Sequence, residues 1–567
     1  MEMVRWPDAS AERYRKLGHW QGRPLGAFLA EHARAAGPAP ALVSDDGRLS
    51  YADLDRRAGH LAAGLVGLGL RTGDRIVVQL PNGPDFFVLL FAALRVGVIP
   101  VLGLPAYRRS EAVHLCDHSG AVAYVVPAED PDPASDFDYR ALAGEVRAQA
   151  PALRHVLVSG EPGSHTALAD VERAGRERAA VGREPVVPGP DPQDTAVLLV
   201  SGGTTGLPKL IPRTHDDYAY NVRAAAEVCG LGPGTVYLAA LPVAHNFALA
   251  CPGALGTLLS GGTVVLSPSP DPETVFPLIE RHRVDVTAVV PPLAALWAQA
   301  AEWSPEDLGS LTLLQVGGAR LDPDTARRVQ ATLGCELQQV FGMAEGLLCL
   351  TRPGDDPERV ATTQGRPLSP DDEIRVVGPD GHDVRPGEVG ELLTRGPYTL
   401  RGYYRAEAHN RTAFTADGFY RTGDLVRVLP DGDVVVAGRQ KDLVNRGGDK
   451  VSSDELEGHL RAHPAVLDAA VVPVPDEYLG ERTCAWIVLR EQDAARYEAR
   501  SGAGEPPEDG GPFGPGGLDA FLDGRGLAPY KKPDLVHIVG SLPFTAVGKL
   551  DKRVLARRAA EAAAGQR

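Results

Sequence analysis

A run of glycine and hydroxyl side chains directly after an apolar segment is the strongest chemical signal in the sequence. In TAVLLVSGGTTGLPK (195–209), an expected strand leads into a loop and then to a lysine. The candidate phosphate-binding residues are Ser201, Gly202, Gly203, Thr204, Thr205, Gly206 and Lys209. Glycines let backbone N–H groups turn towards an anion, and the hydroxyls and the lysine add donors and charge. The Walker A pattern GxxxxGK[ST] is absent, so the segment predicts a phosphate-binding loop of another type.

Charged side chains on turns mark two further regions. The first combines YRTGD (420–424) with GRQKD (438–442), and the second is SLPFTAVGKLDKR (541–553). The Asp424 carboxylate could accept both hydroxyls of a ribose, and Arg439 could donate to that sugar or to a phosphate. Lys549 stands on a glycine-bearing loop. Each of these residues is a common turn or surface residue by itself, so the hypothesis of a site depends on their occurring together.

The elements expected around these residues alternate between strand and helix. This alternation covers residues 50–110 and recurs over 195–350. Such β–α–β repeats predict parallel sheets with helical crossovers. Residues 373–440 instead contain short strands separated by Asp-Gly and Pro-Gly turns, which indicates a small antiparallel β subdomain.

A change of pattern after residue 440 predicts a second domain of the α+β class. KVSSDELEGHLRAHP (450–464) is typical of a capped helix with acidic residues in its first turn, and two strands and another helix follow it. We expect domains at 1–440 and 441–567. Within the second, a Gly/Pro/Glu-rich run at about 490–517 predicts a flexible surface insertion.

Composition excludes several classes of function. The chain has 567 residues and a formal charge of −16, from 58 Lys and Arg against 74 Asp and Glu, which argues against a nucleic-acid binder. No run of about 18 apolar residues is present, so we expect no membrane span. The first residues lack the apolar stretch of a secretory signal, and the six cysteines form no CxxC pair. We therefore expect reduced thiols in a cytoplasmic protein.

In this order and spacing, the motifs resemble those of the adenylate-forming (ANL) superfamily, which includes acyl-CoA synthetases, luciferases and adenylation domains of peptide synthetases. The resemblance covers nearly the whole chain and extends to GGARLDPDTARR (317–328) and FGMAEG (341–346). Within the superfamily, the chain is most similar to stand-alone aryl-acid AMP ligases of siderophore and nonribosomal peptide biosynthesis, which use 2,3-dihydroxybenzoate or salicylate. The closer similarity lies in LPVAHNFALACPG (241–253), VVPPLAALW (289–297), LQVGGA (314–319), LQQVFGMAEGLL (337–348), TRGPYTLRGYY (394–404) and NRGGDKV (445–451).

The resemblance implies a large N-terminal domain with a small mobile C-terminal domain, and a reaction in two halves. A carboxylate first attacks the α-phosphate of ATP, with Mg²⁺ bound, to give an acyl-adenylate; a thiol then displaces AMP. Lys549 would bridge carboxylate and α-phosphate, and Glu345 would bind the metal. The loop 201–209 would hold the β- and γ-phosphates, and Asp424 and Arg439 the ribose. Gly317, Gly318 and Ala319 would line the floor for adenine and substrate. Phe341 would stack nearby, and Gly342 would also belong to the ATP site. One departure is Ala344, where most of the superfamily has Thr, but the aryl-acid branch shares it.

For the second half, the resemblance implies that the small domain rotates about a hinge at Lys441. This rotation would bring Gly447 and Gly448 against a tunnel for pantetheine. The expected partner is a phosphopantetheinylated aryl carrier protein acting in trans.

The acid pocket implied by the resemblance comprises His245 on the carboxylate side, also a catalytic candidate, and Asn246 beside an ortho hydroxyl. Its walls would be Phe247, Val340, Cys251 and Leu348. Dihydroxybenzoate enzymes usually carry Ser where this chain has Cys251, and Val where it has Leu348. A thiol is a weak donor, and the larger aliphatic wall leaves less room. We therefore expect salicylate or a ring-substituted salicylate such as 6-methylsalicylate, rather than 2,3-dihydroxybenzoate.

Several alternatives stay open at this point. Dihydroxybenzoate and 3-hydroxypicolinate share the ortho hydroxyl. An aryl-CoA ligase would use free CoA and would need a basic site for the phosphates of that nucleotide. A catalytically silent adenylate-binding protein would bind nucleotide without exchanging pyrophosphate, although intact Lys549, Glu345 and Asp424 argue against it.

Overall fold

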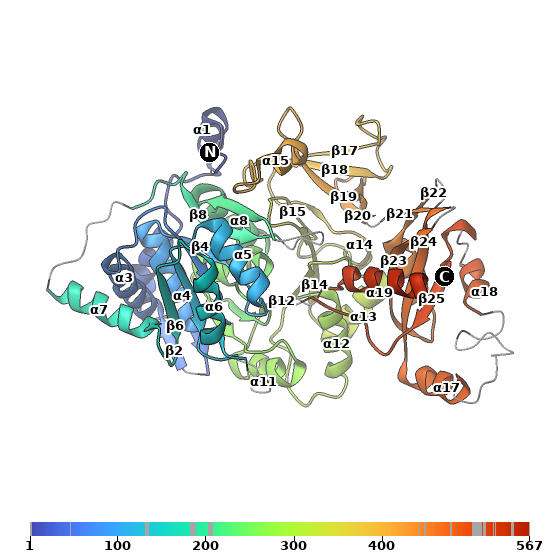
Figure 1. Ribbon diagram of the computed structural model, residues 1–567, viewed down its shortest axis with the longest axis horizontal. Coiled ribbons are helices and arrows are strands. Elements are labelled where there is room, and N and C mark those ends of the chain that lie inside the picture. Colours follow the sequence, from blue (N-terminus) through green and yellow to red (C-terminus); the bar gives the residue numbers. More distant parts are fainter. Residues whose placement is uncertain are drawn as a thin grey trace. The chain divides into compact units, whose positions relative to one another are not determined.

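The computed structural model describes residues 3–45, 47–130, 135, 137–181, 189–201, 208–440, 443–446, 449–476, 479–501, 513, 517–525, 527, 529–545 and 549–565. The chain forms two compact units (Figure 1). The first contains residues 1–374 and 394–421, and the second contains residues 375–393 and 422–567. Along the sequence, the chain thus passes from one unit to the other three times, after residues 374, 393 and 421. The single boundary expected at residue 440 stays a prediction.

The first unit is built on two large sheets that are mainly parallel. The nine-stranded sheet has the order β16 (Arg366–Pro367), β15 (Leu348–Leu350), β14 (Glu336–Gly342), β13 (Leu313–Gly317), β12 (Val286–Val289), β10 (Val236–Ala239), β11 (Thr263–Leu266), β1 (Pro40–Ser44), β2 (Gly47–Ser50). Its pairs from β14 to β1 are parallel, and the strands beyond them on both edges are antiparallel. The parallel sheets predicted from the β–α–β repeats are confirmed.

The seven-stranded sheet carries the loop that the sequence singled out. Its order is β7 (Thr166–Ala167), β6 (His155–Ser159), β5 (Ala123–Pro127), β3 (Arg75–Val78), β4 (Ile99–Leu102), β8 (Thr195–Val200), β9 (Leu210–Thr214). All of its pairs are parallel except β8 with β9. The predicted phosphate-binding loop is thus the connection of an antiparallel hairpin at one edge of this sheet.

Helices cover the sheets because their apolar faces complete the cores. Residues of α11 (Pro272–His282), α12 (Pro291–Ala301) and α13 (Pro323–Leu333) pack with the nine-stranded sheet. Residues of α5 (Arg109–Ser119) and α6 (Tyr139–Gln149) pack with the seven-stranded sheet. Helix α3 (Tyr51–Gly67) begins with a capping box between Ser50 and Asp53. Both α4 (Pro84–Val96) and α7 (Leu168–Ala180) pack against it. The first unit also contains α1 (Asp8–Lys16), α2 (Ala27–Ala36), α8 (His215–Val228), α9 (Asn246–Ala250), α10 (Gly253–Leu259), α14 (Pro357–Thr362) and α15 (Glu407–Ala413).

A four-stranded sheet occupies the region where the β subdomain was expected. Its order is β17 (Glu373–Val377), β18 (Gly390–Arg395), β19 (Tyr420–Val428), β20 (Val434–Arg439). Strands β19 and β20 are antiparallel and pair Asp424 with Arg439. This register places the two candidate ribose-binding residues opposite each other.

The C-terminal part of the second unit is the expected α+β fold. Its sheet contains β21 (Leu443–Arg446), β22 (Asp449–Ser452), β23 (Val466–Asp476), β24 (Gly480–Leu489) and β25 (Leu535–Ile538). Ser452 caps α16 (Ser453–Arg461), as predicted, and α19 (Lys552–Gly565) packs on β23 (Figure 1). The other helical elements are α17 (Glu491–Ser501), α18 (Gly517–Gly524) and a 3₁₀ turn over Pro529–Lys531.

The expectation that a flexible insertion begins at about residue 490 is wrong for residues 491–501. They form α17, and Ala494 and Tyr497 pack on the core of this domain. The run EQDAARYEARS consists mainly of good helix formers, and the glycines and prolines that suggested an insertion lie after it.

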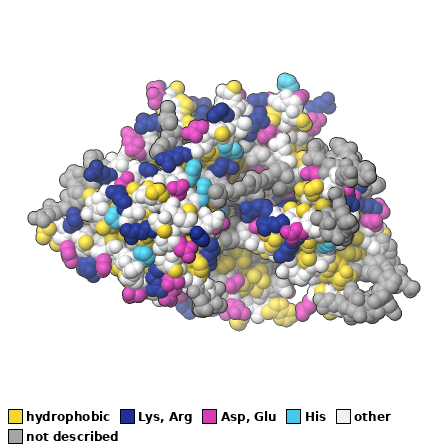
Figure 2. Space-filling model, viewed as in Figure 1, with side chains coloured by type: hydrophobic (Ala, Val, Ile, Leu, Met, Phe, Trp, Pro, Cys, Tyr) yellow, Lys and Arg dark blue, Asp and Glu magenta, His cyan; other side chains and the backbone are white. Residues whose placement is uncertain are grey.

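Basic and acidic side chains are interspersed over the coloured part of the face shown in Figure 2. All six cysteines are buried thiols, as expected. No helix in the described parts of the chain is long and apolar enough to cross a membrane.

Candidate functional site

Ser201 and Lys209 close the predicted phosphate-binding loop at its two ends. The Ser201 N–H donates to the Lys209 carbonyl at 2.9 Å, and the Lys209 N–H donates to Ser201 Oγ at 2.9 Å. The first bond continues the β8–β9 ladder by one residue, and in the second the Ser201 side chain accepts the Lys209 N–H. Gly202, Gly203, Thr204, Thr205 and Gly206 lie outside the described residues.

The residues expected to recognise the acid begin the short helix α9. His245 is its N-cap, and its Nδ1 accepts the N–H of Phe247 at 3.3 Å. In the neutral imidazole the proton is then on Nε2, which can donate to a carboxylate. Asn246 Oδ1 accepts the hydroxyl of Tyr218 at 2.8 Å, so the amide nitrogen is the group left to donate. Burial raises the pKa of Tyr218 well above its usual value, which keeps this hydroxyl a donor.

Cys251 lies at the end of the same helix and contacts Asn246 twice. Its thiol is directed to the Asn246 carbonyl at 3.5 Å, and it accepts from Asn246 Nδ2 at 3.6 Å. Burial raises the pKa of Cys251 to about 12, so the side chain remains a thiol. Its single weak proton is therefore already directed to a backbone carbonyl.

Three of the expected pocket residues meet where β13 and β14 end. Gly317 pairs with Val340 across the parallel strands. A Cβ at Gly317 would lie 2.8 Å from the Val340 carbonyl oxygen and 3.0 Å from Phe247 Cζ. Only glycine therefore fits between this ring and this strand. The carboxyl ends of parallel strands are the usual ligand edge of such sheets.

The remaining wall residue, Leu348, lies on β15 opposite Gly342. A Cβ at Gly342 would overlap the Leu348 side chain. The Leu348 N–H donates to the Tyr398 hydroxyl at 3.1 Å, and that hydroxyl donates to Asp372 at 2.6 Å. Burial raises the pKa of Asp372 to about 7. Of the residues expected to contact adenine, Gly318 and Ala319 are exposed just after β13, and Phe341 is half-buried on β14.

Glu345, the expected metal ligand, contacts a tyrosine that the sequence analysis did not name. Tyr403 Oη donates to Glu345 Oε1 at 2.7 Å. Lys209 Nζ lies 5.3 Å from the centroid of the same ring, within range of a cation–π contact. Burial, followed by the charge of Glu345, raises the pKa of Tyr403 far above its usual value. Tyr403 thus joins the phosphate-loop lysine to the metal-binding candidate.

A buried ion pair, Arg213 with Asp217, lies next to both the expected metal-binding segment and the tyrosine that holds Asn246. Arg213 Nε is 2.8 Å from Asp217 Oδ1, and the two side chains are 0% and 2% exposed. Arg213 Nη1 donates to the carbonyl of Ala344 at 3.2 Å, and its guanidinium carbon lies 4.9 Å from the centroid of the Tyr218 ring. Arg213 therefore touches the residue before Glu345 and the tyrosine that holds Asn246.

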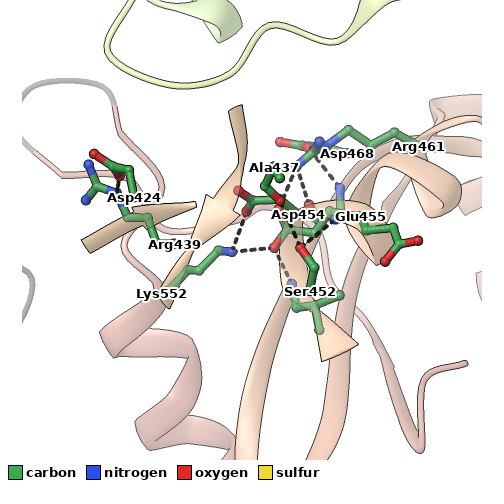
Figure 3. A network of polar contacts seen from close by, with 12 residues as sticks. Asp424, Ala437, Arg439, Ser452, Asp454, Glu455, Arg461, Asp468 and Lys552 are labelled. Atoms are coloured by element: carbon green, nitrogen blue, oxygen red, sulfur yellow. Dashed lines mark hydrogen bonds and ion pairs between the residues drawn. The ribbon is translucent and has the colours of Figure 1, made fainter. Parts of the chain in front are cut away.

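In the second unit, Asp424 and Arg439 form an ion pair. Arg439 Nε lies 2.8 Å from Asp424 Oδ1, and Figure 3 shows the two side chains side by side. The Asp424 side chain is 6% exposed and that of Arg439 is 47% exposed. The carboxylate is thus oriented by a cation that itself stays accessible to a ligand.

Two hydrogen bonds join Lys549 to Thr545. The Thr545 N–H donates to the Lys549 carbonyl at 2.6 Å, and the Lys549 N–H donates to Thr545 Oγ1 at 3.2 Å. Close by in the chain, Lys552 is 2.8 Å from Glu457 and 3.4 Å from Asp454 (Figure 3 shows the contact with Asp454). These contacts fix the start of α19 on α16, just after Lys549.

The expected hinge residue Lys441 and the expected tunnel residues Gly447 and Gly448 lie outside the described residues. The residues that the sequence analysis missed are Arg213, Tyr218, Tyr398 and Tyr403. Two of them, Tyr398 and Tyr403, stand in the motif TRGPYTLRGYY that carried the resemblance, so the motif was a signal for them.

Comparison with known proteins finds relatives over nearly the full length. The 2,3-dihydroxybenzoate-AMP ligase of Bacillus subtilis is 50% identical over 97% of this chain and 96% of its own. The salicyl-AMP ligase / salicyl-S-ArCP synthetase of Mycobacterium tuberculosis is 49% identical over 98% of this chain and 94% of its own. Relatives whose names include a CoA ligase or synthase also match.

Solved structures and family profiles agree with these relatives. The apo structure of Mycobacterium smegmatis MbtA superposes with a TM-score of 0.73 and 47% identity, over 98% of this chain and 99% of that one. The family described as AMP-binding enzyme matches residues 29–404, and the AMP-binding enzyme C-terminal domain matches residues 455–549. The chain therefore belongs to the AMP-binding enzyme family and is an adenylate-forming ligase.

Proposed function

We propose that this ligase activates salicylate or a ring-substituted salicylate such as 6-methylsalicylate, and then transfers the acyl group to the phosphopantetheine thiol of an aryl carrier protein acting in trans. We place it in the cytoplasm, in a siderophore-type or other nonribosomal peptide pathway. The observation that carries the substrate proposal is the position of the Asn246 amide, which Tyr218 and Cys251 hold by hydrogen bonds.

The chemistry of an ortho-hydroxybenzoate explains why a donor is needed there. In salicylate the phenolic proton bonds to the neighbouring carboxylate, so the phenolic oxygen faces outward as an acceptor. Because Tyr218 already donates to Asn246 Oδ1, the Asn246 NH₂ group supplies the matching donor. On the other side of the acid, His245 Nε2 would donate to the carboxylate.

The contacts of Cys251 favour salicylate over 2,3-dihydroxybenzoate. A 3-hydroxyl would need a partner at this wall, but the thiol is already directed to the Asn246 carbonyl. Leaving a buried hydroxyl without a partner costs about 1–3 kcal/mol. Dihydroxybenzoate remains the second candidate because the Bacillus subtilis relative is named for it, and 3-hydroxypicolinate is the third.

The first half-reaction joins two anions, and the chain supplies cations and donors to bring them together. A carboxylate oxygen of the acid attacks the α-phosphorus of ATP, the bond to the bridging oxygen breaks, and pyrophosphate leaves. Lys549 would neutralise the carboxylate and α-phosphate, and Lys209 would neutralise the outer phosphates. Asp424, oriented by Arg439, would accept the ribose hydroxyls. Catalysis of this kind rests on positioning and on charge stabilisation.

As an adenylate-forming enzyme the protein uses ATP with Mg²⁺, and its residues fit that ion. Mg²⁺ binds proteins through one or two carboxylates and keeps waters and phosphate oxygens as its other ligands. Glu345 provides one such carboxylate, and the described residues contain no group of three or more metal-ligating side chains. When bound, the ion would neutralise phosphate charge beside Lys209.

In the second half-reaction the thiol sulfur attacks the acyl carbon, the carbon–oxygen bond to AMP breaks, and the thiol proton is lost. We propose a carrier protein as the source of this thiol, because the Mycobacterium tuberculosis relative is named as a salicyl-S-ArCP synthetase. Free CoA is the alternative. Incubating the adenylating enzyme with either a phosphopantetheinylated carrier or CoA decides between them: faster acylation of CoA would contradict the proposal.

Replacing Asn246 with alanine should reduce the preference for salicylate over benzoate. The variant removes the donor to the phenolic oxygen. The ratio of kcat/KM for salicylate to kcat/KM for benzoate should therefore fall roughly 5- to 30-fold, which corresponds to about 1–2 kcal/mol. The values are measured by acid-dependent ATP–pyrophosphate exchange. An unchanged ratio would show that Asn246 does not recognise the ortho hydroxyl.

Replacing Cys251 with serine should raise the use of 2,3-dihydroxybenzoate relative to salicylate by about tenfold, because a hydroxyl is a stronger hydrogen-bonding group than a thiol. Cys335→Ser is the matched control, since this buried thiol lies in the helix-covered core of the nine-stranded sheet. If both variants have the wild-type preference, Cys251 does not contribute to substrate choice.

A further inference from the structure

We infer that Tyr403 is a positioning residue that holds the metal-binding carboxylate and the phosphate-loop lysine in one arrangement. The inference rests on the proposed function, because it takes Glu345 as the metal ligand and Lys209 as a phosphate-binding group. Tyr403 contacts both of them: its hydroxyl donates to Glu345 Oε1 at 2.7 Å, and Lys209 Nζ lies 5.3 Å from its ring centroid.

The direction of the hydrogen bonds follows from the number of protons. Tyr403 has one hydroxyl proton, and Glu345 as a carboxylate can only accept it. The Tyr420 hydroxyl, 2.8 Å from that of Tyr403, must therefore be the donor in their contact. Tyr420 thus fixes the Tyr403 hydroxyl, which in turn fixes the carboxylate. The other oxygen, Oε2, would then be the one available to hold the metal.

The backbone on either side of Tyr403 is tied to the same two groups. The Leu400 N–H donates to the carbonyl of Glu345 at 2.7 Å, and the Tyr404 N–H donates to the carbonyl of Leu210, next to Lys209, at 2.9 Å. Gly346 has a φ of +155°, and a Cβ there would lie 2.5 Å from Thr399 Cα. Segment 399–404 therefore packs against Glu345 and Gly346 and is hydrogen-bonded to the first residue of β9, next to Lys209.

The ring and the hydroxyl of Tyr403 make separable contributions. The hydroxyl orients Glu345, whereas the face of the ring attracts the Lys209 ammonium. Outer partners of metal ligands are worth about 10- to 100-fold in metal affinity. Tyr403→Phe removes the hydroxyl and keeps the ring, and Tyr403→Leu removes both.

The adjacent Tyr404 offers a matched control. It is also fully buried, but its hydroxyl donates to the Ser119 carbonyl at 3.2 Å, away from Glu345 and Lys209. Tyr404→Phe therefore makes the same chemical change one residue away. Thermal unfolding of each variant shows which of them are folded.

The test measures binding without turnover, with Mn²⁺ in place of Mg²⁺ and β,γ-methylene-ATP in place of ATP. Electron paramagnetic resonance gives the Mn²⁺ affinity of the complex, and calorimetry gives the affinity for the analogue without metal. Tyr403→Phe should weaken Mn²⁺ binding by about tenfold and leave metal-free analogue binding unchanged. Tyr403→Leu should weaken both, and Tyr404→Phe neither.

Equal Mn²⁺ affinities for Tyr403→Phe and Tyr404→Phe would overturn the inference and leave the proposed function standing. If the wild-type protein binds neither Mn²⁺ nor the analogue, the proposed function fails and the inference fails with it. If Tyr403→Phe does not fold, Tyr420→Phe replaces it, since this variant removes the donor behind Tyr403. Unchanged Mn²⁺ affinity in that variant would also overturn the inference.

Discussion

Lys549→Ala should lower kcat/KM for acid-dependent ATP–pyrophosphate exchange by at least about 100-fold, because one positioned charge at a reacting phosphate is typically worth that much. The same variant should convert a supplied acyl-adenylate to thioester at nearly the wild-type rate. The difference arises because the first half-reaction brings two anions together, whereas the second joins a neutral acyl carbon to a thiol. Both rates are measured on one preparation.

Lys531→Ala is the matched control for this variant. Lys531 belongs to the same unit and forms a partly exposed ion pair with Glu455 at 2.7 Å. Surface pairs of this kind contribute little to stability, so both half-reactions should proceed as in the wild type. Equal losses in the two half-reactions of Lys549→Ala would contradict the role that we propose for this lysine.

Arg213→Met should destabilise the protein by about 3–5 kcal/mol, because it leaves the buried Asp217 carboxylate without its cation. Asp217 is also tied to the start of α8, where it accepts the Thr214 N–H at 2.9 Å and the Thr214 hydroxyl at 2.8 Å. The loss should therefore extend to Tyr218, which holds Asn246. Denaturant unfolding followed by fluorescence measures the change.

Two further variants make this prediction specific. Arg213→Met combined with Asp217→Asn should regain part of the lost stability, because the amide still accepts the capping bonds but carries no charge. Arg327→Met removes an exposed partner of Glu358 and should leave the unfolding midpoint unchanged. A loss below about 1 kcal/mol for Arg213→Met would show that the pair behaves like a surface pair.

Much of the fold follows from local patterns in the sequence. The parallel sheets are predicted by the β–α–β repeats and the helix in 450–464 by its capping pattern, and the structure confirms both. The insertion expected from about residue 490 shows the limit of composition, because helix-forming residues at 491–501 precede the glycines and prolines.

The supporting contacts of the site could not be predicted in the same way. Tyr218 reaches Asn246 across 28 residues, and Tyr403 reaches Glu345 across 58. Neither pair shares an element, so periodicity and capping patterns contain no information about it. The motifs led to predictions of which groups meet a ligand, whereas the side chains that orient those groups are visible only in the folded structure, where distant segments pack together.

ATP–pyrophosphate exchange with the purified wild-type protein tests the proposed activity and substrate class in one measurement. The panel of acids contains salicylate, 6-methylsalicylate, 2,3-dihydroxybenzoate, 3-hydroxypicolinate, benzoate and several amino acids. We expect the highest kcat/KM for salicylate or its methyl derivative, a lower value for benzoate and no exchange with amino acids. Exchange led by 2,3-dihydroxybenzoate would contradict the assignment of Cys251 and Leu348. No exchange with any aryl acid would contradict the account as a whole.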